Sequence, residues 1–386
     1  MKTMKMRLTK SQHGFSLLEL MISATIGVLV VLAMTSLFRT GMNTTFTVTQ
    51  RAETQQNMRA AIEFLTKDIS LAGSGLPSGG LQLATAGGAT RVACNQTGTC
   101  YVPGDVYNAN YMTGILPGFG NGVQNSAIIA AAPAATNDSI TSIYCDYNFP
   151  LSNFTFAFPT NTSATATTIN AGVTPNNVLA PGGLNVGDLM LFTVTSAGNG
   201  TTSQGTSSVQ TAAAVGEITG LTPGTPPTIA FAPADALNFN QAVGDANSLA
   251  YVIANSMGGG TTTTACRLEA VTYFLQVPPA GGTVQTPRLM RQVNGLPAVA
   301  VADNIINLQF SYDVISATTG LMNANLANVI AAGDSPALIQ KVNMWVMGQS
   351  LTTGGNRSQS MYLASSVSTR NMSFCNSYSN SSTVCQ

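Results

Sequence analysis

The sequence predicts an α+β chain in which one long N-terminal α-helix is followed by a β-rich globular head. Three observations carry this prediction. An apolar run covers residues 15–38, a helical stripe of apolar side chains covers residues 58–72, and short β-like segments begin after Pro77. We therefore expect a transmembrane helix at 15–38, its amphipathic continuation at 39–72 and a head at 73–386.

The apolar run contains 24 residues, enough for a helix to cross a hydrocarbon core of about 30 Å. Glu19 is its only charge, and a carboxylate at membrane depth costs about 2.5–3.5 kcal/mol, so we expect Glu19 to have a partner. The run is too long for an ordinary secretory signal and lacks a cleavage site of the A-x-A type. The flanking basic residues favour a cytoplasmic start; they are Lys2, Lys5, Arg7 and Lys10.

The second half of the predicted helix is amphipathic. Its apolar residues recur with helical spacing at Met58, Ala61, Ile62, Leu65, Ile69 and Ala72. No proline precedes Pro77, and the glycines at 73 and 75 supply the stop. Residues 41–49 combine glycine with several threonines, which form helices poorly, so we expect this segment to be the softest part of the helix.

The rest of the chain alternates β-branched and aromatic residues with turn formers. We expect strands at 138–147, 188–196, 249–255, 269–277, 304–314 and 341–349. The Gly- and Thr-rich stretches at 155–185, 197–230 and 257–264 predict loops or hairpin connections. Together these patterns predict one head of packed sheets with the amphipathic half-helix lying across it.

Charge argues against broad nucleic-acid binding. Only 8% of residues are charged, and the first fourteen residues hold four of the fifteen basic ones and no acid. The remainder carries 15 − 4 = 11 basic residues against 15 acidic ones, a net charge of −4. Non-specific nucleic-acid binding depends on Lys and Arg, so this body is a poor match, and the composition is typical of an exported β-protein.

Cysteine usage predicts disulfides in an oxidising compartment. The six cysteines are Cys94, Cys100, Cys145, Cys266, Cys375 and Cys385. Six cysteines allow about fifteen pairings, and the sequence cannot choose among them. Short separation favours Cys94–Cys100 and Cys375–Cys385, which would leave Cys145–Cys266 as a longer link; buried free thiols are the alternative.

The sequence argues against an enzyme. His13 is the only histidine and lies before the apolar run, so a catalytic triad or a histidine-based zinc site has no histidine in the rest of the chain. We expect no cofactor and no metal; the best calcium candidate, Asp245 to Asn247, lacks EF-hand spacing. The other acids lie near predicted strand ends and turns, and the aromatic residues Phe310, Tyr312 and Trp345 are expected in the core.

The segment from Lys10 to Gly14, followed by Phe15-Ser-Leu-Leu-Glu19-Leu-Met-Ile, resembles the class III signal of type IV pilins and type II secretion pseudopilins. The resemblance implies the type IV pilin fold. It also implies a leader at residues 1–14, cleavage by prepilin peptidase between Gly14 and Phe15, and N-methylation of Phe15. Glu19 corresponds to the acid that is the hallmark of this family. Cleavage would create a cationic amine in an apolar environment, and Glu19 is a suitable counter-charge within one chain or on a neighbour.

Several segments resemble the PilW group of minor pilins, which is related to the J-type minor pseudopilin of type II secretion. They include RAETQQNMRAAIEFLTKDISLAGSG from residue 51 and VADNIINLQFSYDV from residue 301. The resemblance implies a low-copy subunit that primes or caps a pilus used for twitching motility, DNA uptake or cell adhesion. Its implied partners are other minor and major pilins, prepilin peptidase, the inner-membrane assembly platform and a tip adhesin.

The same resemblance implies a location. The chain would lie in the inner membrane as a single-pass protein with a periplasmic head, and later near the tip of the filament. Two alternatives stay open, a J-type pseudopilin of the type II secretion machine and a surface adhesin or binding module merely anchored by this helix.

Overall fold

The structure is a computed structural model of the chain and divides into two units, Met1–Glu53 and Thr54–Gln386. It describes residues 14–77, 80–84, 93–94, 100–101, 111–118, 137–146, 155–157, 167–172, 183–197, 209–224, 227–233, 235, 237, 239–241, 244, 247–256, 261–276, 287–294, 296–316, 319–329, 332–350 and 359–372.

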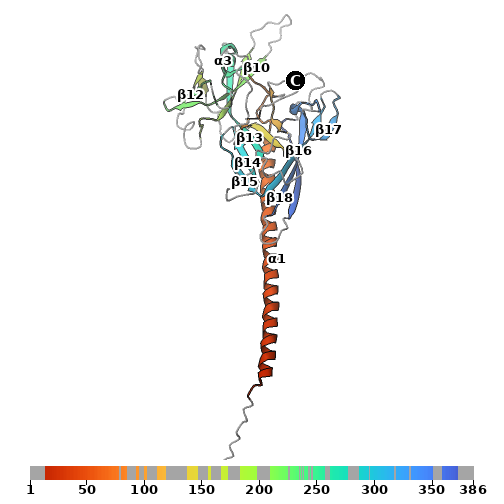
Figure 1. Ribbon diagram of the computed structural model, residues 1–386. Coiled ribbons are helices and arrows are strands. Elements are labelled where there is room, and N and C mark those ends of the chain that lie inside the picture. Colours follow the sequence, from red (N-terminus) through yellow and green to blue (C-terminus); the bar gives the residue numbers. More distant parts are fainter. Residues whose placement is uncertain are drawn as a thin grey trace, which may run out of the picture. The chain divides into compact units, whose positions relative to one another are not determined.

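Helix α1 extends without interruption from Leu17 to Leu71 (Figure 1). In the first unit every side chain from residue 14 to residue 49 is exposed. The Thr-rich segment is helical, and hydroxyls there donate hydrogen bonds to the carbonyl oxygen four residues earlier, as Thr44 does to Thr40 and Thr45 does to Gly41. The helix is long and apolar enough to cross a membrane by its length and composition.

In the second unit the end of α1 buries the predicted stripe. Ala61, Leu65 and Ile69 are fully buried, and Met58 is nearly so. The helix ends where the sequence predicts, because Gly73 adopts a positive φ of 80°, the left-handed conformation that commonly follows a helix C-terminus. A strong intrinsic helix propensity is not needed in this segment, because packing of the apolar face against the head stabilises the helix.

The largest sheet has seven strands. Its main order is β10-β9-β13-β14-β15, while β6 pairs with β13, and β5 pairs with β6. These strands are β5 (Ile115–Gly118), β6 (Ser139–Cys145), β9 (Leu189–Ala197), β10 (Val209–Glu217), β13 (Thr261–Gln276), β14 (Arg288–Val293) and β15 (Val299–Asp303). At Leu268 the long strand β13 faces Leu189 of β9 and Cys145 of β6, so those two strands flank it on opposite sides.

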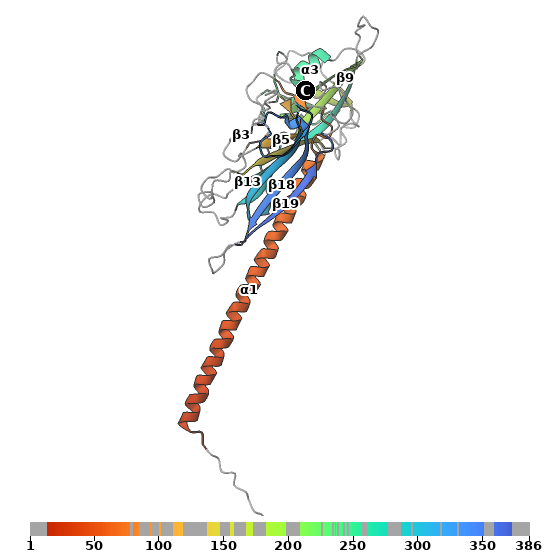
Figure 2. The ribbon, with the colours of Figure 1, turned by 90° about the vertical axis from the view of Figure 1, so that its right-hand side faces the viewer.

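A second sheet contains the C-terminal strands in the order β17-β16-β18-β19, and Figure 2 shows β18 beside β19. Its strands are β16 (Ile305–Ile315), β17 (Met322–Leu326), β18 (Ile339–Gln349) and β19 (Ser360–Ser368), and the 3-10 helix η3 (Pro336–Leu338) leads into β18. A third sheet has the order β11-β12-β8-β7. Its strands are β7 (Thr155–Ala157), β8 (Thr167–Gly172), β11 (Gly220–Thr222) and β12 (Thr228–Phe231).

Two short pairs complete the sheets, and every described strand pair is antiparallel. The pairs join β1 (Leu81–Gln82) to β4 (Tyr111–Met112) and β2 (Ala93–Cys94) to β3 (Cys100–Tyr101). The structure thus confirms an α+β fold with a long apolar N-terminal helix and a β-rich head.

The main core of the head joins three layers. It brings Leu65 of α1 together with Tyr273 of the seven-stranded sheet and Phe310 of the C-terminal sheet. In Figure 1 the end of α1 accordingly lies beside β13–β15 on one side and β16 and β18 on the other. The helix therefore fills the space between two sheets, and its burial contributes to the stability of both.

Two sequence predictions were wrong in detail. Residues 249–255 form a helix, α3 (Leu249–Ser256), rather than a strand. The hydroxyl of Ser248 accepts a hydrogen bond from the Tyr251 N–H and caps this helix, while Leu249 and Val252 are buried among the side chains of the third sheet and β9. Short apolar runs fit either structure, and here the cap residue decided.

The stretches predicted as loops also contain strands. Residues 155–185 include β7 and β8, residues 197–230 include β10 and β11 with most of β12, and β13 begins within 257–264. The sequence of β10, VQTAAAVGE, has a weak β propensity. Its pairing with β9 along nine residues and the burial of Ala214 and Val215 override that weakness.

Candidate functional site

The first part of the candidate site is the start of α1. Gly14, Phe15 and Ser16 precede the helix, and the Ser16 carbonyl accepts a hydrogen bond from the Leu20 N–H. Glu19 lies in the first turn, where the partial positive charge of the helix N-terminus favours a carboxylate. Glu19 is exposed, and it has no ion-pair partner among the residues that the structure describes.

The helix surface that follows is apolar on every side. Phe15 is 84% exposed, Leu29 65% and Phe38 69%, and the intervening apolar residues are exposed as well. A contiguous apolar surface of this size on a protein marks a site of membrane or protein contact. A helix that is apolar all round is stable only when another medium or another chain surrounds it.

The second part of the candidate site is the cluster around Asp68, which we call the anchor cluster: Asp68, Tyr144, Glu269, Tyr273 and Arg291. Asp68 lies near the end of α1 and is 2% exposed. Its carboxylate accepts hydrogen bonds from Tyr273 Oη at 2.5 Å, from Arg291 Nε at 2.8 Å and from Tyr144 Oη at 3.0 Å. Glu269 accepts from the same Tyr144 hydroxyl at 3.1 Å, so the single proton is shared between two carboxylates.

Arg291 is the cation that compensates the buried carboxylate of Asp68 in the anchor cluster. A carboxylate near a helix C-terminus is unfavourable, and burial adds to that cost unless a cation compensates. Burial opposes the charge of Arg291, but its hydrogen bond and attraction to Asp68 hold the pKa of its guanidinium above the ordinary value. Burial, together with the negative charge of Asp68, raises the pKa of both Tyr144 and Tyr273, so these phenols stay neutral donors.

The comparison with known families concerns the first part of the site. Residues 9–35 match the prokaryotic N-terminal methylation motif. Neither a curated protein nor a solved structure matches the chain. The motif indicates prepilin processing of the kind found in type IV pilins and pseudopilins. It points to a structural subunit rather than an enzyme, to interaction with pilins and prepilin peptidase in general, and to membrane anchoring followed by incorporation into a filament.

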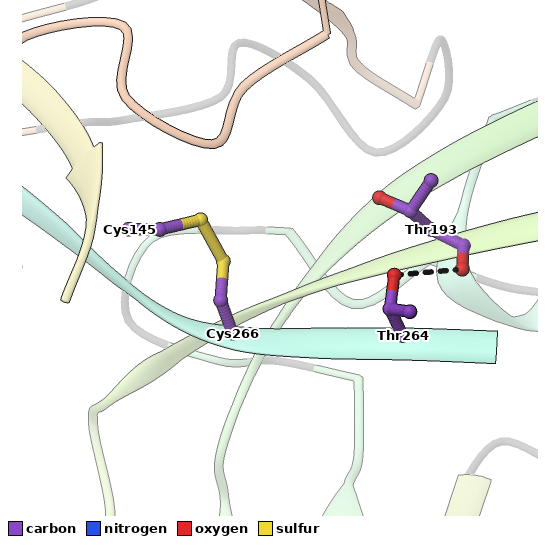
Figure 3. The surroundings of a disulfide bond; sticks show 4 residues. All are labelled: Cys145, Thr193, Thr264 and Cys266. Carbon is purple, nitrogen blue, oxygen red and sulfur yellow. Dashed lines mark hydrogen bonds between the residues drawn. A yellow bond between two sulfur atoms is a disulfide. The ribbon is translucent and has the colours of Figure 1, made fainter. Parts of the chain in front are cut away.

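A disulfide joins Cys145 on β6 to Cys266 on β13, with 5.7 Å between their Cα atoms and a sequence separation of 121 (Figure 3). Arg267, the next residue of β13, and Asp146, which directly follows β6, form an ion pair. On the other side of β13, Thr264 Oγ1 donates to the Thr193 carbonyl oxygen of β9 at 3.5 Å, which Figure 3 also shows. A disulfide and an ion pair therefore link β13 to the end of β6, and a side-chain hydrogen bond links it to β9.

The other cysteine pairings stay predictions. Cys94 and Cys100 face one another in the ladder of β2 and β3. Cys375 and Cys385 lie outside the described residues, and nothing tests their pairing.

The scattered acids have structural contacts in the described part of the chain. Asp138 Oδ2 accepts from the Phe310 N–H, Asp188 Oδ2 accepts from the Asn185 N–H, and Asp303 pairs with Arg288 at 2.9 Å. Burial raises the pKa of Asp188. Asp245 lies outside the described residues, and no cluster of three metal-ligating side chains occurs within them.

The predicted aromatic core is partly wrong. Phe310 and Tyr312 are buried as expected, but Trp345 lies on the other face of the C-terminal sheet. Along β18 the buried residues Val342, Met344 and Val346 alternate with partly exposed ones, and Trp345 belongs to the second set. The alternation in VNMWVM predicts this placement, and hydrophobicity alone does not.

The sequence analysis also missed Asp68. It follows Leu65 by three residues and Ala61 by seven, so it lies on the buried face of the predicted stripe. A charge at such a position signals a buried ion pair, but its partners come from strands more than seventy residues away. Their identity depends on the tertiary fold, which the pattern along α1 does not contain.

Proposed function

We propose that the chain is a minor type IV pilin of the PilW kind, a low-abundance structural subunit that helps to prime or cap pilus assembly. The observation that carries the proposal is the methylation motif at residues 9–35, which covers the start of a helix whose side chains are all exposed as far as residue 49. Such a surface suits storage in a membrane and later packing against the helices of other subunits.

In this proposal prepilin peptidase cuts between Gly14 and Phe15, and Phe15 becomes the N-methylated first residue. The new amine is a cation in an apolar environment, and Glu19 in the first helical turn is its counter-charge. Because Glu19 has no ion-pair partner in the described part of its own chain, it is suited to bind the amine of a neighbouring subunit. The attraction would set the axial register of the incoming subunit.

The head supports a subunit that is exported before it assembles. The disulfide between Cys145 and Cys266 is of a kind that persists in oxidising compartments. The proposal therefore includes an inner-membrane precursor with a periplasmic head, and a final place near the pilus tip. Its partners would be major and other minor pilins, prepilin peptidase, the inner-membrane assembly platform and a tip adhesin.

Mass spectrometry of the intact mature chain, purified without reductant from cells with active prepilin peptidase, tests the processing. We expect a chain of 386 − 14 = 372 residues that begins at methylated Phe15. With Cys94–Cys100 and Cys375–Cys385 also paired, its mass should be lower by six hydrogens than that of the reduced chain. A chain that still begins at Met1, or that is cut elsewhere, would contradict the proposal.

A second experiment separates the minor pilin from the J-type pseudopilin, which has the same motif. Deletion of the gene should reduce the yield of sheared pili while secretion of type II substrates continues, and the protein should be far less abundant than the major subunit in those pili. Loss of secretion with normal pili would assign the chain to the type II secretion machine instead.

A further inference from the structure

The outer face of the C-terminal sheet carries a groove that lies apart from the anchor cluster. It has a volume of about 540 Å³ and lies over β16, β18 and β19, with Asn325 of β17 at its side. Volumes of this size are typical of ligand sites. Ring and amide groups line it, among them Trp345, Gln309 and Asn343, and none of its described lining side chains is charged.

The ladder explains why these groups converge. Gln309 faces Trp345, which faces Ala364 on β19, and in the next row Ser311 faces Asn343, which faces Ser366. Side chains of directly paired residues lie on the same face of a sheet. The small Ala and Ser side chains of β19 leave the Trp345 ring accessible, and a polar row runs beside it.

The hydrogen-bonding groups of this face are largely unused. The side chains of Gln309, Ser311 and Ser366 make no hydrogen bond within the part of the chain that the structure describes. Asn343 is oriented by two bonds from Nδ2, one to Asp313 Oδ1 and one to Asn325 Oδ1, both at 3.1 Å. Its amide oxygen is left as an acceptor. The groove thus offers several donors and acceptors, of which the Asn343 amide is held in place.

A stacked aromatic pair lies at the groove. The rings of Trp345 and Tyr362 lie 6.2 Å apart between centroids with an interplanar angle of 28°, and Tyr362 is 71% exposed. The charged groups next to this face neutralise each other. Lys341 Nζ lies 3.3 Å from Asp313 Oδ2. Burial works against the charge of Asp313, but hydrogen bonds from the Asn325 N–H, Lys341 and Asn343 hold the pKa of its carboxyl below the ordinary value.

We propose that this groove binds a neutral saccharide chain. A sugar ring has an apolar C–H face, which fits the open face of an aromatic ring, and a rim of hydroxyls that both donate and accept hydrogen bonds. Amide and hydroxyl side chains beside Trp345 match that rim. An anionic ligand would find no unpaired cation among the lining groups, and a purely apolar ligand would leave the amides without partners. The proposal does not depend on which filament the chain enters.

Trp345 is the only tryptophan in the chain, so intrinsic fluorescence reports on the groove directly. The experiment uses the full chain in a zwitterionic detergent without a sugar headgroup. Neutral tetrasaccharides of glucose and of N-acetylglucosamine are the probes, and a sulfated oligosaccharide is the charged comparison. We expect at least one neutral probe to change the emission in a saturable way and to protect Trp345 from acrylamide quenching, and the sulfated probe to bind at least tenfold more weakly.

Variants locate the binding. Gln309→Ala removes one amide and should weaken binding about three- to tenfold, the loss expected for one hydrogen bond, and Tyr362→Ala should weaken it by a similar factor. Gln276→Ala on β13, outside the groove, is the matched control and should bind as the wild type does. An emission that no neutral saccharide changes would overturn the proposal. So would wild-type affinity in both groove variants, or a change caused only by a second copy of the chain, which would assign this face to subunit packing.

Discussion

The two halves of α1 belong to one helix but meet opposite surroundings. Residues 14–49 expose every side chain, whereas the helix from residue 54 onward buries Met58, Ala61, Leu65 and Ile69. The exposed half is apolar on every side as far as Phe38 and has a single acid, and the packed half has one apolar face that includes a buried acid. This difference indicates that the side chains of the first half suit contacts with other molecules, whereas those of the second half pack against the head of the same chain.

Glu19 in the exposed half and Asp68 in the packed half differ in their partners. Asp68 is satisfied inside the chain by Arg291 and two phenols. Glu19 has no ion-pair partner within the described residues. Removing either acid should therefore affect different properties, stability of the head in one case and assembly in the other.

The largest effect on stability is expected for Asp68→Ala. The variant leaves the partly buried Arg291 without its main partner and takes the acceptor from Tyr273. We expect a loss of about 2–4 kcal/mol, below the full value for a broken buried pair because Glu269 stays within 3.9 Å of Arg291. Urea unfolding of the full chain in detergent measures it. Glu63→Ala, which removes an exposed acid of the same helix, is the control; equal stability of both variants would contradict an anchoring role.

Glu19→Ala should leave the stability of the head unchanged and should impair assembly instead. The urea midpoint of the head and cleavage after Gly14 should stay as in the wild type, while incorporation into pili should fall at least tenfold because the neighbouring amine loses its counter-charge. Quantitative mass spectrometry of the subunit in sheared pili and in membranes gives the ratio. Glu19→Gln, which keeps the shape and removes the charge, should behave like Glu19→Ala, and Ser23→Ala is the control on the same helix. Normal recovery of both Glu19 variants would refute the counter-charge.

Much of this comparison could be predicted from the sequence. The period of the stripe, the absence of proline and the glycines after Ala72 predicted the helix and its end, because these are local properties. Strands with clear alternation, such as 304–314, were also predicted correctly. Local patterns failed at residues 249–255, where a serine cap outweighed β-branched composition, and at β10, whose order depends on its pairing with β9.

The functional sites were harder to predict from the sequence than the fold was. The motif around Gly14, Phe15 and Glu19 is contiguous and needs no tertiary information. The anchor cluster combines residues of α1, β6, β13 and β14, so only the folded chain brings them together. Trp345 was expected in the core because it is hydrophobic, yet its strand places it beside Gln309 and Asn343 on the outer face. Successive residues of a strand point to opposite faces of the sheet, so the position of Trp345 in β18 placed its side chain on the outer face.

The anchor cluster also makes the packed half sensitive to alkali. Burial and the charge of Asp68 raise the pKa of Tyr144 and Tyr273 above the value of about 10 expected in the unfolded chain. A raised pKa means that the stabilisation is fully present below pH 10 and is lost as pH rises beyond it, by up to about 1.4 kcal/mol per pH unit for each phenol. Tyr273→Phe should reduce this slope by one phenol's share between pH 10 and 11, as urea titrations would measure. Tyr362→Phe, which removes a hydroxyl already in solvent, should not; an unchanged slope in Tyr273→Phe would contradict the assignment.

The smallest effect compares two glycines. Gly41 lies in the exposed half, where an added Cβ would meet no atom within 4 Å, while a Cβ at Gly348 of β18 would lie 2.8 Å from Thr54 Cγ2 and 3.1 Å from Met58. Gly41→Ala should therefore strengthen the Thr-rich segment 41–49 by about 1 kcal/mol and slow its amide exchange roughly fivefold. Gly348→Ala should weaken the packing of α1 on the head. Hydrogen exchange followed by mass spectrometry measures both, with residues 58–69 as the slow reference. Wild-type residues 41–49 that already exchange as slowly as residues 58–69 would contradict the comparison. The exposed half would then be as rigid without packing as the packed half is with it.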